Sequence, residues 1–230
     1  MSQGGSERWW MAVGGLALVA YVARVRPRLF RWGATDEEAE RVLPGDDEVP
    51  GAQIHGTRAI TIDAPPEQVW PWLAQIGYRR AGWYAFDFAD NDSIPSATRI
   101  IPELQAPEVG QLVGEEGNAI RAIESPRLLL LAFHHPRVEW ILKGGLWPRF
   151  GEESWAFVLE PIDGGRRTRL ISRLHYRLPF GIHLLWWPLF EVADLVFQPL
   201  MLRRIRDRVV STVVEPERPS SAAPPAAAAL

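Results

Sequence analysis

The sequence contains no cysteine, and only one of its 25 basic residues is a lysine, Lys143. The absence of cysteine excludes disulfide bonds, thiolate nucleophiles and cysteine-based metal sites, and it suits a reducing compartment. The formal net charge is −3, and the arginines form only short clusters. Because nucleic-acid binding requires an extended basic face, we expect no nucleic acid among the partners.

The spacings typical of catalytic and metal-binding residues are also missing. His134 and His135 are adjacent, so in a strand their side chains would point to opposite faces. The chain has no His-x-x-x-His pair and no Gly-x-Ser-x-Gly segment. Asp87, Asp90 and Asp92 lack the glycine and the terminal glutamate of a calcium loop. We therefore assign no metal, no cofactor and no catalytic residue.

Residues 9–23 are uncharged, with two tryptophans at the start, and Arg24 is the first of four closely spaced arginines after them. As a helix this run spans roughly 22 Å, and flanking arginines extend its usable length. We interpret it as a single-pass membrane anchor, and the arginines after it predict that the rest of the chain faces the cytoplasm. The alternatives are a soluble helix and a cleaved signal peptide, although a signal peptide carries its charges before the apolar run.

Composition divides the chain into four parts. These are a membrane anchor with its basic flank at 1–32, an acidic linker with a short helix at 33–55, a folded domain at 56–214 and a tail at 215–230. Thr35 is spaced from Glu38 as in a capping box, which predicts the start of the short helix. We expect a solvated linker and a disordered tail, because neither offers enough apolar surface to offset the entropy of ordering.

The most informative segment is 58–77, RAITIDAPPEQVWPWLAQIG. Its alternating start, 58–63, predicts a half-buried strand, and Pro66 suits the first position of a helix. The apolar residues that follow recur at helical spacing, which places Trp70 toward the core and Trp72 on another face.

This strand, its Ala-Pro-Pro-Glu corner and the Val-Trp-Pro-Trp-Leu helix resemble the opening of the START-like, helix-grip superfamily (SRPBCC), which includes polyketide cyclases and lipid-transfer domains. Residues 154–161, SWAFVLEP, also resemble this superfamily, and the element order does so over 56–212. The phrases at 32–38 and 43–46 resemble the lead-in of a membrane-anchored branch. The resemblance implies an internal ligand cavity, and it names neither a ligand nor a reaction.

We expect an α+β fold in which about seven antiparallel strands wrap around a long C-terminal helix, after an N-terminal transmembrane helix. The weakest strand signals lie at 110–113 and 138–142. The last helix should bury an apolar stripe that includes Val192 and Val196, and Pro199 should kink or divide it. Residues 179–190 are strongly apolar and are expected either under this helix or at the membrane.

The cavity that the resemblance implies would lie between the sheet and the last helix. Alternation places Arg173 and His175 on one face of the strand at 168–177. This face is either exposed to solvent or turned inward by the curvature of the sheet, where it would supply a charged anchor. The candidate ligand-binding residues are Trp83, Tyr84, Asp87, His134, Trp155, Phe157, Arg173 and His175.

We expect a membrane-anchored helix-grip domain that binds a hydrophobic small molecule or lipid without catalysis. One alternative is an enzyme of the cyclase/dehydratase type, for which Asp87, His134 and His175 are the plausible bases. Another is a protein-interaction module with a collapsed cavity. A contiguous cavity lined by tryptophan and phenylalanine would favour binding, and a buried His–Asp pair within that cavity would favour the enzyme. A filled interior would favour the interaction module.

Overall fold

The computed structural model describes residues 4–113, 118–135, 151–177 and 182–214. The helices and strands in chain order are α1 (Gly4–Ala20), the π-helical turn η1 (Tyr21–Val25), α2 (Arg26–Leu29), α3 (Asp36–Glu40), β1 (Ile54–Ile62), α4 (Pro66–Ala74), α5 (Asp87–Asp90), the short 3-10 helix η2 (Pro102–Leu104), β2 (Ala119–Glu124), β3 (Leu128–His135), β4 (Gly151–Ile162), the 3-10 turn η3 (Asp163–Gly165), β5 (Arg167–Arg177) and α6 (Ile182–Val214). The expected tail at 215–230 lies outside these residues.

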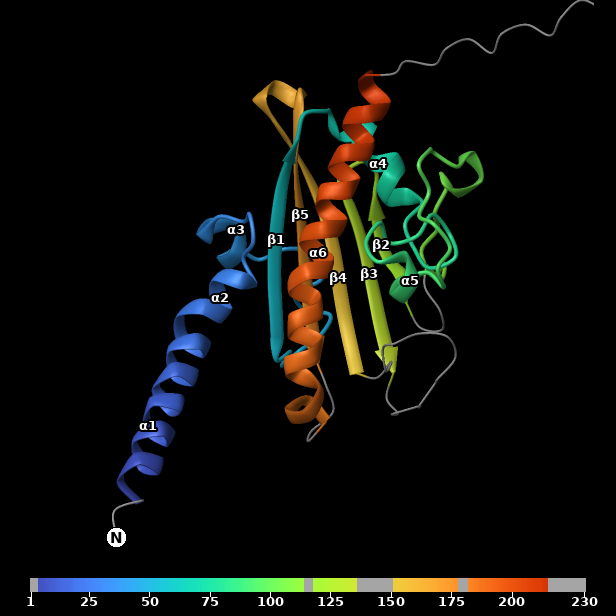
Figure 1. Ribbon diagram of the computed structural model, residues 1–230. Coiled ribbons are helices and arrows are strands. Elements are labelled where there is room, and N and C mark those ends of the chain that lie inside the picture. The colour runs from blue at the N-terminus through green and yellow to red at the C-terminus, as the bar shows by residue number, and fades with distance from the viewer. Residues whose placement is uncertain (1–3, 114–117, 136–150, 178–181, 215–230) are drawn as a thin grey trace, which may run out of the picture.

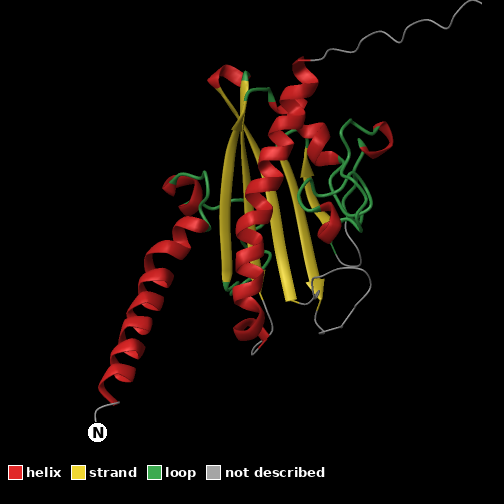
Figure 2. Ribbon diagram, in the orientation of Figure 1, coloured by secondary structure: helices red, strands yellow, loops and turns green. Residues whose placement is uncertain are grey.

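Within the described residues, one antiparallel sheet has five strands in the order β1-β5-β4-β3-β2. The helix α6 lies across one face of it, which we call the inner face (Figures 1 and 2). The structure is therefore α+β with a helix-grip arrangement. The expected count of about seven strands is wrong, because residues 110–113 contribute only an isolated bridge between Leu112 and Ala119. The strand predicted at 138–142 lies outside the described residues.

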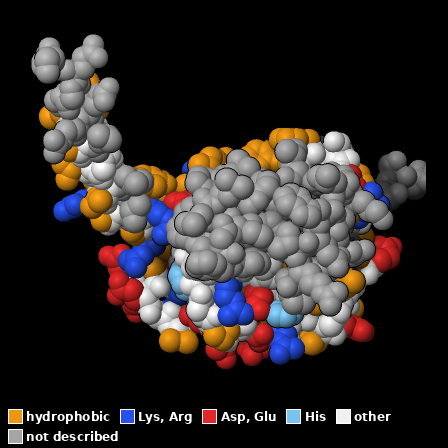
Figure 3. Space-filling model, turned by 90° about the horizontal axis from the view of Figure 1, so that it is seen from below, with side chains coloured by type: hydrophobic (Ala, Val, Ile, Leu, Met, Phe, Trp, Pro, Cys, Tyr) orange, Lys and Arg blue, Asp and Glu red, His pale blue; other side chains and the backbone are white. Residues whose placement is uncertain are grey.

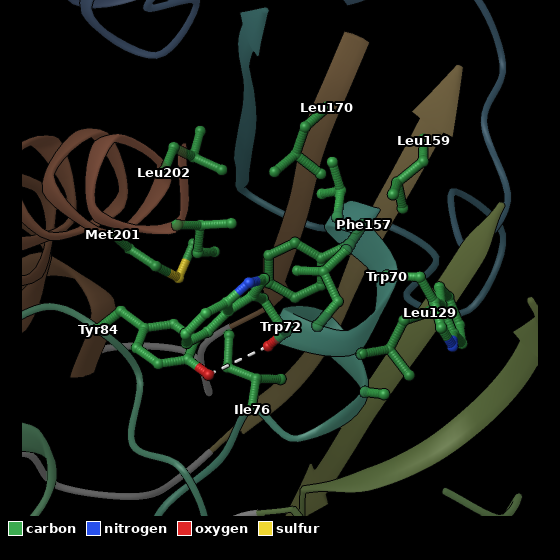
Figure 4. Packing of buried hydrophobic residues seen from close by; sticks show 14 of the residues in the cluster. Trp70, Trp72, Ile76, Tyr84, Leu129, Phe157, Leu159, Leu170, Met201 and Leu202 are labelled. Atoms are coloured by element: carbon green, nitrogen blue, oxygen red, sulfur yellow. Dashed lines mark hydrogen bonds between the residues drawn. The ribbon is translucent and has the colours of Figure 1, made fainter. Parts of the chain in front are cut away.

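The inner face of the sheet, α4 and the C-terminal half of α6 enclose a hydrophobic core (Figure 4). Large side chains from every layer meet there, and they include Ile62, Leu73, Ile76, Leu129, Phe157, Leu159, Leu170, Met201, Leu202 and Ile205. Trp72 is only 1% exposed and Trp70 is 8% exposed, so the expectation that Trp72 lies away from the core is wrong. The loop after α4 encloses the second face of that helix, where the Tyr84 hydroxyl donates to the Trp72 carbonyl at 3.2 Å.

The acidic linker packs on the outer face of the sheet, and the expectation that it is solvated is wrong. Leu43 is buried against Ala59 of β1 and Ile171 of β5. The carboxylate of Glu38 accepts hydrogen bonds from Arg169 Nε and Nη2 at 2.7 and 2.8 Å. The negative charge of the linker thus meets the arginine row of β5, and burial of Leu43 holds the linker there.

The free edge of β1 is covered by the segment after α2. The backbone N–H groups of Thr57 and Ala59 donate to the carbonyls of Phe30 and Trp32 at 2.9 and 3.1 Å. Gly33 follows with a φ of +70°, and a Cβ there would lie 2.1 Å from the Ala59 carbonyl oxygen. Only glycine fits this close approach, which leaves β1 closed to pairing with another chain.

The N-terminal helix projects away from the body of the molecule, from α2 along α1 (Figure 1). No helix among the described residues has the length and apolar character needed to cross a membrane. The capping box that begins α3 is confirmed, since Thr35 Oγ1 accepts from the Glu38 N–H at 3.1 Å. The expected break at Pro199 is wrong, because α6 continues through this residue.

Candidate functional site

Aromatic residues predicted to line a cavity come together on the inner face. Trp155 and Phe157 alternate along β4, and their rings lie 4.9 Å apart. Trp83, from the loop after α4, stacks on Trp155 at 5.4 Å with an angle of 17° between the planes. The ring of Phe197, from α6, lies 6.3 Å from that of Trp155 and is tilted by 53° to it. We call Trp83, Trp155 and Phe197 the aromatic wall.

Two other predicted residues have structural partners nearby. Tyr84 is fully buried, and its hydroxyl accepts a hydrogen bond from Gln75 Nε2 at 2.9 Å. Burial raises the pKa of Tyr84 to about 12, so the hydroxyl stays neutral. Asp87 begins α5 and accepts a hydrogen bond from Ser96 Oγ at 2.5 Å. These contacts tie the loop to itself and to α4.

Arg173 and His175 do not turn inward. Both lie on the outer face, where Arg173 Nη2 donates to the Glu38 and Arg41 carbonyls at 2.9 Å each. His175 Nε2 lies 3.6 Å from Asp46 Oδ1, and burial lowers its pKa. The linker covers this face, so the proposed charged anchor inside a cavity is wrong for both residues.

His134 also lies on the outer face. Its side chain is 67% exposed, and Nδ1 lies 3.1 Å from Glu152 Oε1. Phe133, the preceding residue on β3, faces inward, so alternation along the strand turns the His134 side chain outward. It therefore has no access to the aromatic wall.

The inner face instead carries polar residues that the sequence analysis did not single out. We call Arg58, Glu153, Ser172, Asp194 and Gln198 the inner polar layer. Arg58 has no exposed surface, and its Nη2 donates to Asp194 Oδ2 at 2.5 Å. This ion pair joins β1 to α6 inside the fold. Burial raises the pKa of Asp194, and the Arg58 charge opposes that rise.

Hydrogen bonds connect this ion pair to the aromatic wall. Gln198 Nε2 donates to Asp194 Oδ1 at 2.8 Å, and Gln198 Oε1 accepts from Ser172 Oγ at 2.9 Å. Ser172 Oγ in turn accepts from Trp155 Nε1 at 2.8 Å. Each of these polar groups is buried with a partner, as the cost of desolvation requires.

Glu153 is the carboxyl group of the layer that has no arginine partner among the described residues. It lies two residues before Trp155 on β4 and opposite Tyr176 on β5, so its side chain shares their inner face. Burial, and then the negative charge of Asp194, raise the pKa of Glu153 to about 7. A carboxyl group with this pKa gains and loses a proton near neutral pH, which is a property common at functional sites.

A second ion pair lies one helical turn from Asp194. Glu191 is 3% exposed, and both of its carboxylate oxygens lie 3.0 Å from Arg26 Nε. The Tyr21 hydroxyl donates to Glu191 Oε1 at 3.0 Å. The N-terminal helix is thereby attached to α6 through the π-helical turn η1, a kind of turn often found at functional positions.

Apolar periodicity in the sequence does not point to these residues. It predicts that Val192 and Val196 are buried, but they are 60% and 53% exposed. The N-terminal half of α6 instead buries Glu191, Asp194 and Gln198, whose spacing of three and four residues matches one helical face. A stripe of polar residues at that spacing was the available signal. On β1, Arg58 stands in the same alternation as the apolar residues at 60 and 62.

No group of three or more histidine, aspartate and glutamate side chains in the described part of the chain could hold a metal ion. The inner polar layer offers two carboxyl groups, of which one is bound by Arg58. Its chemistry is therefore that of hydrogen bonding, charge pairing and proton exchange.

No family model matches the chain, and no curated protein matches it. Similar solved structures include a polyketide cyclase-like protein from Corynebacterium glutamicum, with 17% identity, a TM-score of 0.38 and coverage of 70% of this chain and 93% of that chain. A protein from Arthrobacter aurescens has 15% identity and a TM-score of 0.40, with coverage of 68% and 86%. Ara h 8.0201 has 12% identity and a TM-score of 0.34, with coverage of 69% and 98%. These are likenesses of the fold alone.

The raised pKa of Glu153 predicts a pH-dependent effect on stability. The folded chain binds this proton more tightly than the unfolded chain does, so stability falls as the pH rises from about 4.5 to about 7. Glu153→Gln should therefore raise the free energy of unfolding by about 1–3 kcal/mol at pH 8 and by much less at pH 5. Urea unfolding at both pH values measures it, with Glu124→Gln at an exposed site as control. Equal effects of Glu153→Gln at the two pH values would contradict the assignment.

Proposed function

We propose that this chain binds a hydrophobic small molecule or a lipid between the inner face of the sheet and the N-terminal half of α6, without catalysing a reaction. The observation that carries the proposal is the aromatic wall beside the inner polar layer. Ligand sites are mostly apolar and aromatic, with a few fixed polar groups that orient the ligand. Trp155 belongs to both parts, because its ring faces Trp83 and its Nε1 donates to Ser172.

A cyclase or dehydratase activity is the second candidate, and Glu153 is the observation that favours it. The sequence suggests three other residues as bases. Of these, Asp87 begins α5 and is bound by Ser96, while His134 and His175 lie on the outer face. Glu153 is the inner-facing group whose pKa suits general acid–base chemistry near neutral pH. Such a role would require a substrate proton within about 3 Å of its carboxyl group.

The N-terminal helix supports a location at a membrane. The side chains of Trp9, Trp10, Leu16 and Val19 are between 58% and 71% exposed, so this helix presents large apolar residues at its surface. Arginines surround its base, where blue side chains meet the projecting helix in Figure 3. Aromatic residues followed by arginines are typical of a segment at a membrane with its basic end in the cytoplasm. We therefore propose that residues 9–23 attach the chain to a membrane and that the domain faces the cytoplasm.

Ligand binding is tested by titrating the chain with a dansyl-labelled undecyl alcohol and following the dansyl emission. Phe197→Ala should weaken binding about tenfold or more, because it removes a side chain from the aromatic wall. Phe88→Ala is the matched control, since Phe88 is 67% exposed and lies outside the wall. Thermal melting checks that both variants fold. Equal weakening by the two substitutions would place binding elsewhere, and absence of binding by any form would favour the interaction module.

Membrane attachment is tested by sedimentation of the full chain with phosphatidylcholine–phosphatidylserine vesicles. The chain should sediment with the vesicles, and the combined substitution Trp9→Ala, Trp10→Ala, Leu16→Ala should release most of it, because less apolar area is buried in lipid. Val42→Ala is the control, as Val42 is 87% exposed on the linker. Wild-type chain that stays in the supernatant would contradict attachment.

A further inference from the structure

The buried ion pairs leave one carboxyl group without a positive partner. Glu191 pairs with Arg26, and Asp194 pairs with Arg58. Glu153 is partly buried, and it has neither a hydrogen bond nor an ion pair to any residue that the structure describes. When Glu153 is ionised, this part of the interior therefore holds one more negative group than positive groups.

The surroundings of Glu153 are aromatic on one side and acidic on the other. Trp155 follows it on the same face of β4, and Tyr176 faces it from β5. Asp194 is the charged group that acts on it from α6, while Tyr176 is the titratable group that acts on it from the sheet. The nearest arginine of the layer, Arg58, is already bound to Asp194. No described group supplies the cation that would balance Glu153.

We propose that the ligand carries a positively charged nitrogen on an apolar body and that this nitrogen pairs with the Glu153 carboxylate. The inference rests on the proposed function, because it requires a ligand at the inner face. An ammonium group would form a charge-assisted hydrogen bond with the carboxylate. The π faces of the aromatic wall also favour a positive group nearby, and the apolar body would contact the same rings.

The cation available to an anionic ligand in this layer is Arg58, whose charge is already paired with Asp194. Arg58 Nη2 is held by Asp194, while Nη1 and Nε are buried without a hydrogen-bond partner in the described part of the chain, and Nη1 lies beside Gly56. The guanidinium carbon lies 5.3 Å from the centre of the Phe30 ring. Another negative group would also be repelled by Asp194 and Glu153. We therefore expect an amine to bind best, a matched alcohol to bind less well and a matched carboxylate to bind worst.

The test compares three dansyl-labelled undecyl chains that end in an amine, a hydroxyl or a carboxylate. At pH 8 the wild-type chain should bind the amine at least about tenfold more tightly than the alcohol. Glu153→Gln should abolish that difference and leave the affinity for the alcohol within about twofold. Glu124→Gln removes one negative charge from an exposed position and should preserve the preference for the amine.

The pH dependence of wild-type binding gives a second measurement that needs no variant. Affinity for the amine should rise as the pH increases through about 7, because the carboxyl group of Glu153 ionises over this range. Affinity for the alcohol should change little. If Glu153→Gln does not fold, as judged by thermal melting, the pH dependence of wild-type binding still tests whether the amine pairs with Glu153.

The outcomes separate the two proposals. Equal affinities for the three probes, or a preference for the amine that Glu153→Gln leaves intact, would overturn the cationic ligand and leave the binding site standing. Tighter binding of the carboxylate would overturn the cationic ligand as well. Failure of all three probes to bind would overturn both proposals.

Discussion

The ion pair between Arg58 and Asp194 determines how the N-terminal half of α6 sits on the sheet. Among the described side chains of this half, Asp194 and Gln198 are buried, and Val192 and Val196 are exposed, so apolar burial does not account for how these residues are placed. The C-terminal half is held by apolar residues in the core. A buried ion pair is tolerated where other hydrogen bonds complete it, and Gln198 supplies one to Asp194, whereas Nε and Nη1 of Arg58 have no hydrogen-bond partner among the residues described. The N-terminal half of α6 is thus packed through an ion pair and hydrogen bonds, and the C-terminal half is packed through apolar contacts. The proposed site lies beside the first half, and the hydrophobic core lies beside the second.

Charge also attaches the N-terminal segments to the domain. Glu38 binds Arg169 on the outer face, and Glu191 binds Arg26 beside the inner polar layer. These contacts fix the point from which α1 leaves, and α1 runs toward the end of the molecule where β1, β4 and α6 begin (Figure 1). Glu153, near the start of β4, lies toward the same end. A membrane in contact with α1 would therefore lie nearer to the proposed site than to the hydrophobic core, which suits an apolar ligand held in lipid.

The sequence was sufficient to predict those helices and strands that follow from hydrophobic periodicity and from local capping residues. Residues 58–77 predicted a strand and a helix, and Thr35 predicted a capped helix, because these signals act within a few residues. Ion pairs between residues far apart in the chain could not be predicted from these local signals. The acidic linker and the arginine row of β5 were both recognised, but nothing local showed that they meet. The same holds for Arg58 and Asp194, which are 136 residues apart and look like surface charges until the fold joins them.

A double-mutant cycle on this ion pair tests the account most directly. Arg58→Met and Asp194→Leu should each lower the free energy of unfolding by about 3–5 kcal/mol, since each leaves one buried charge unpaired. The double variant should lose at least about 2 kcal/mol less than the two single losses added together, because no unpaired charge remains. Urea unfolding of the four chains gives the coupling. Additive losses, or single substitutions that cost less than about 1 kcal/mol, would show that α6 is held without this pair.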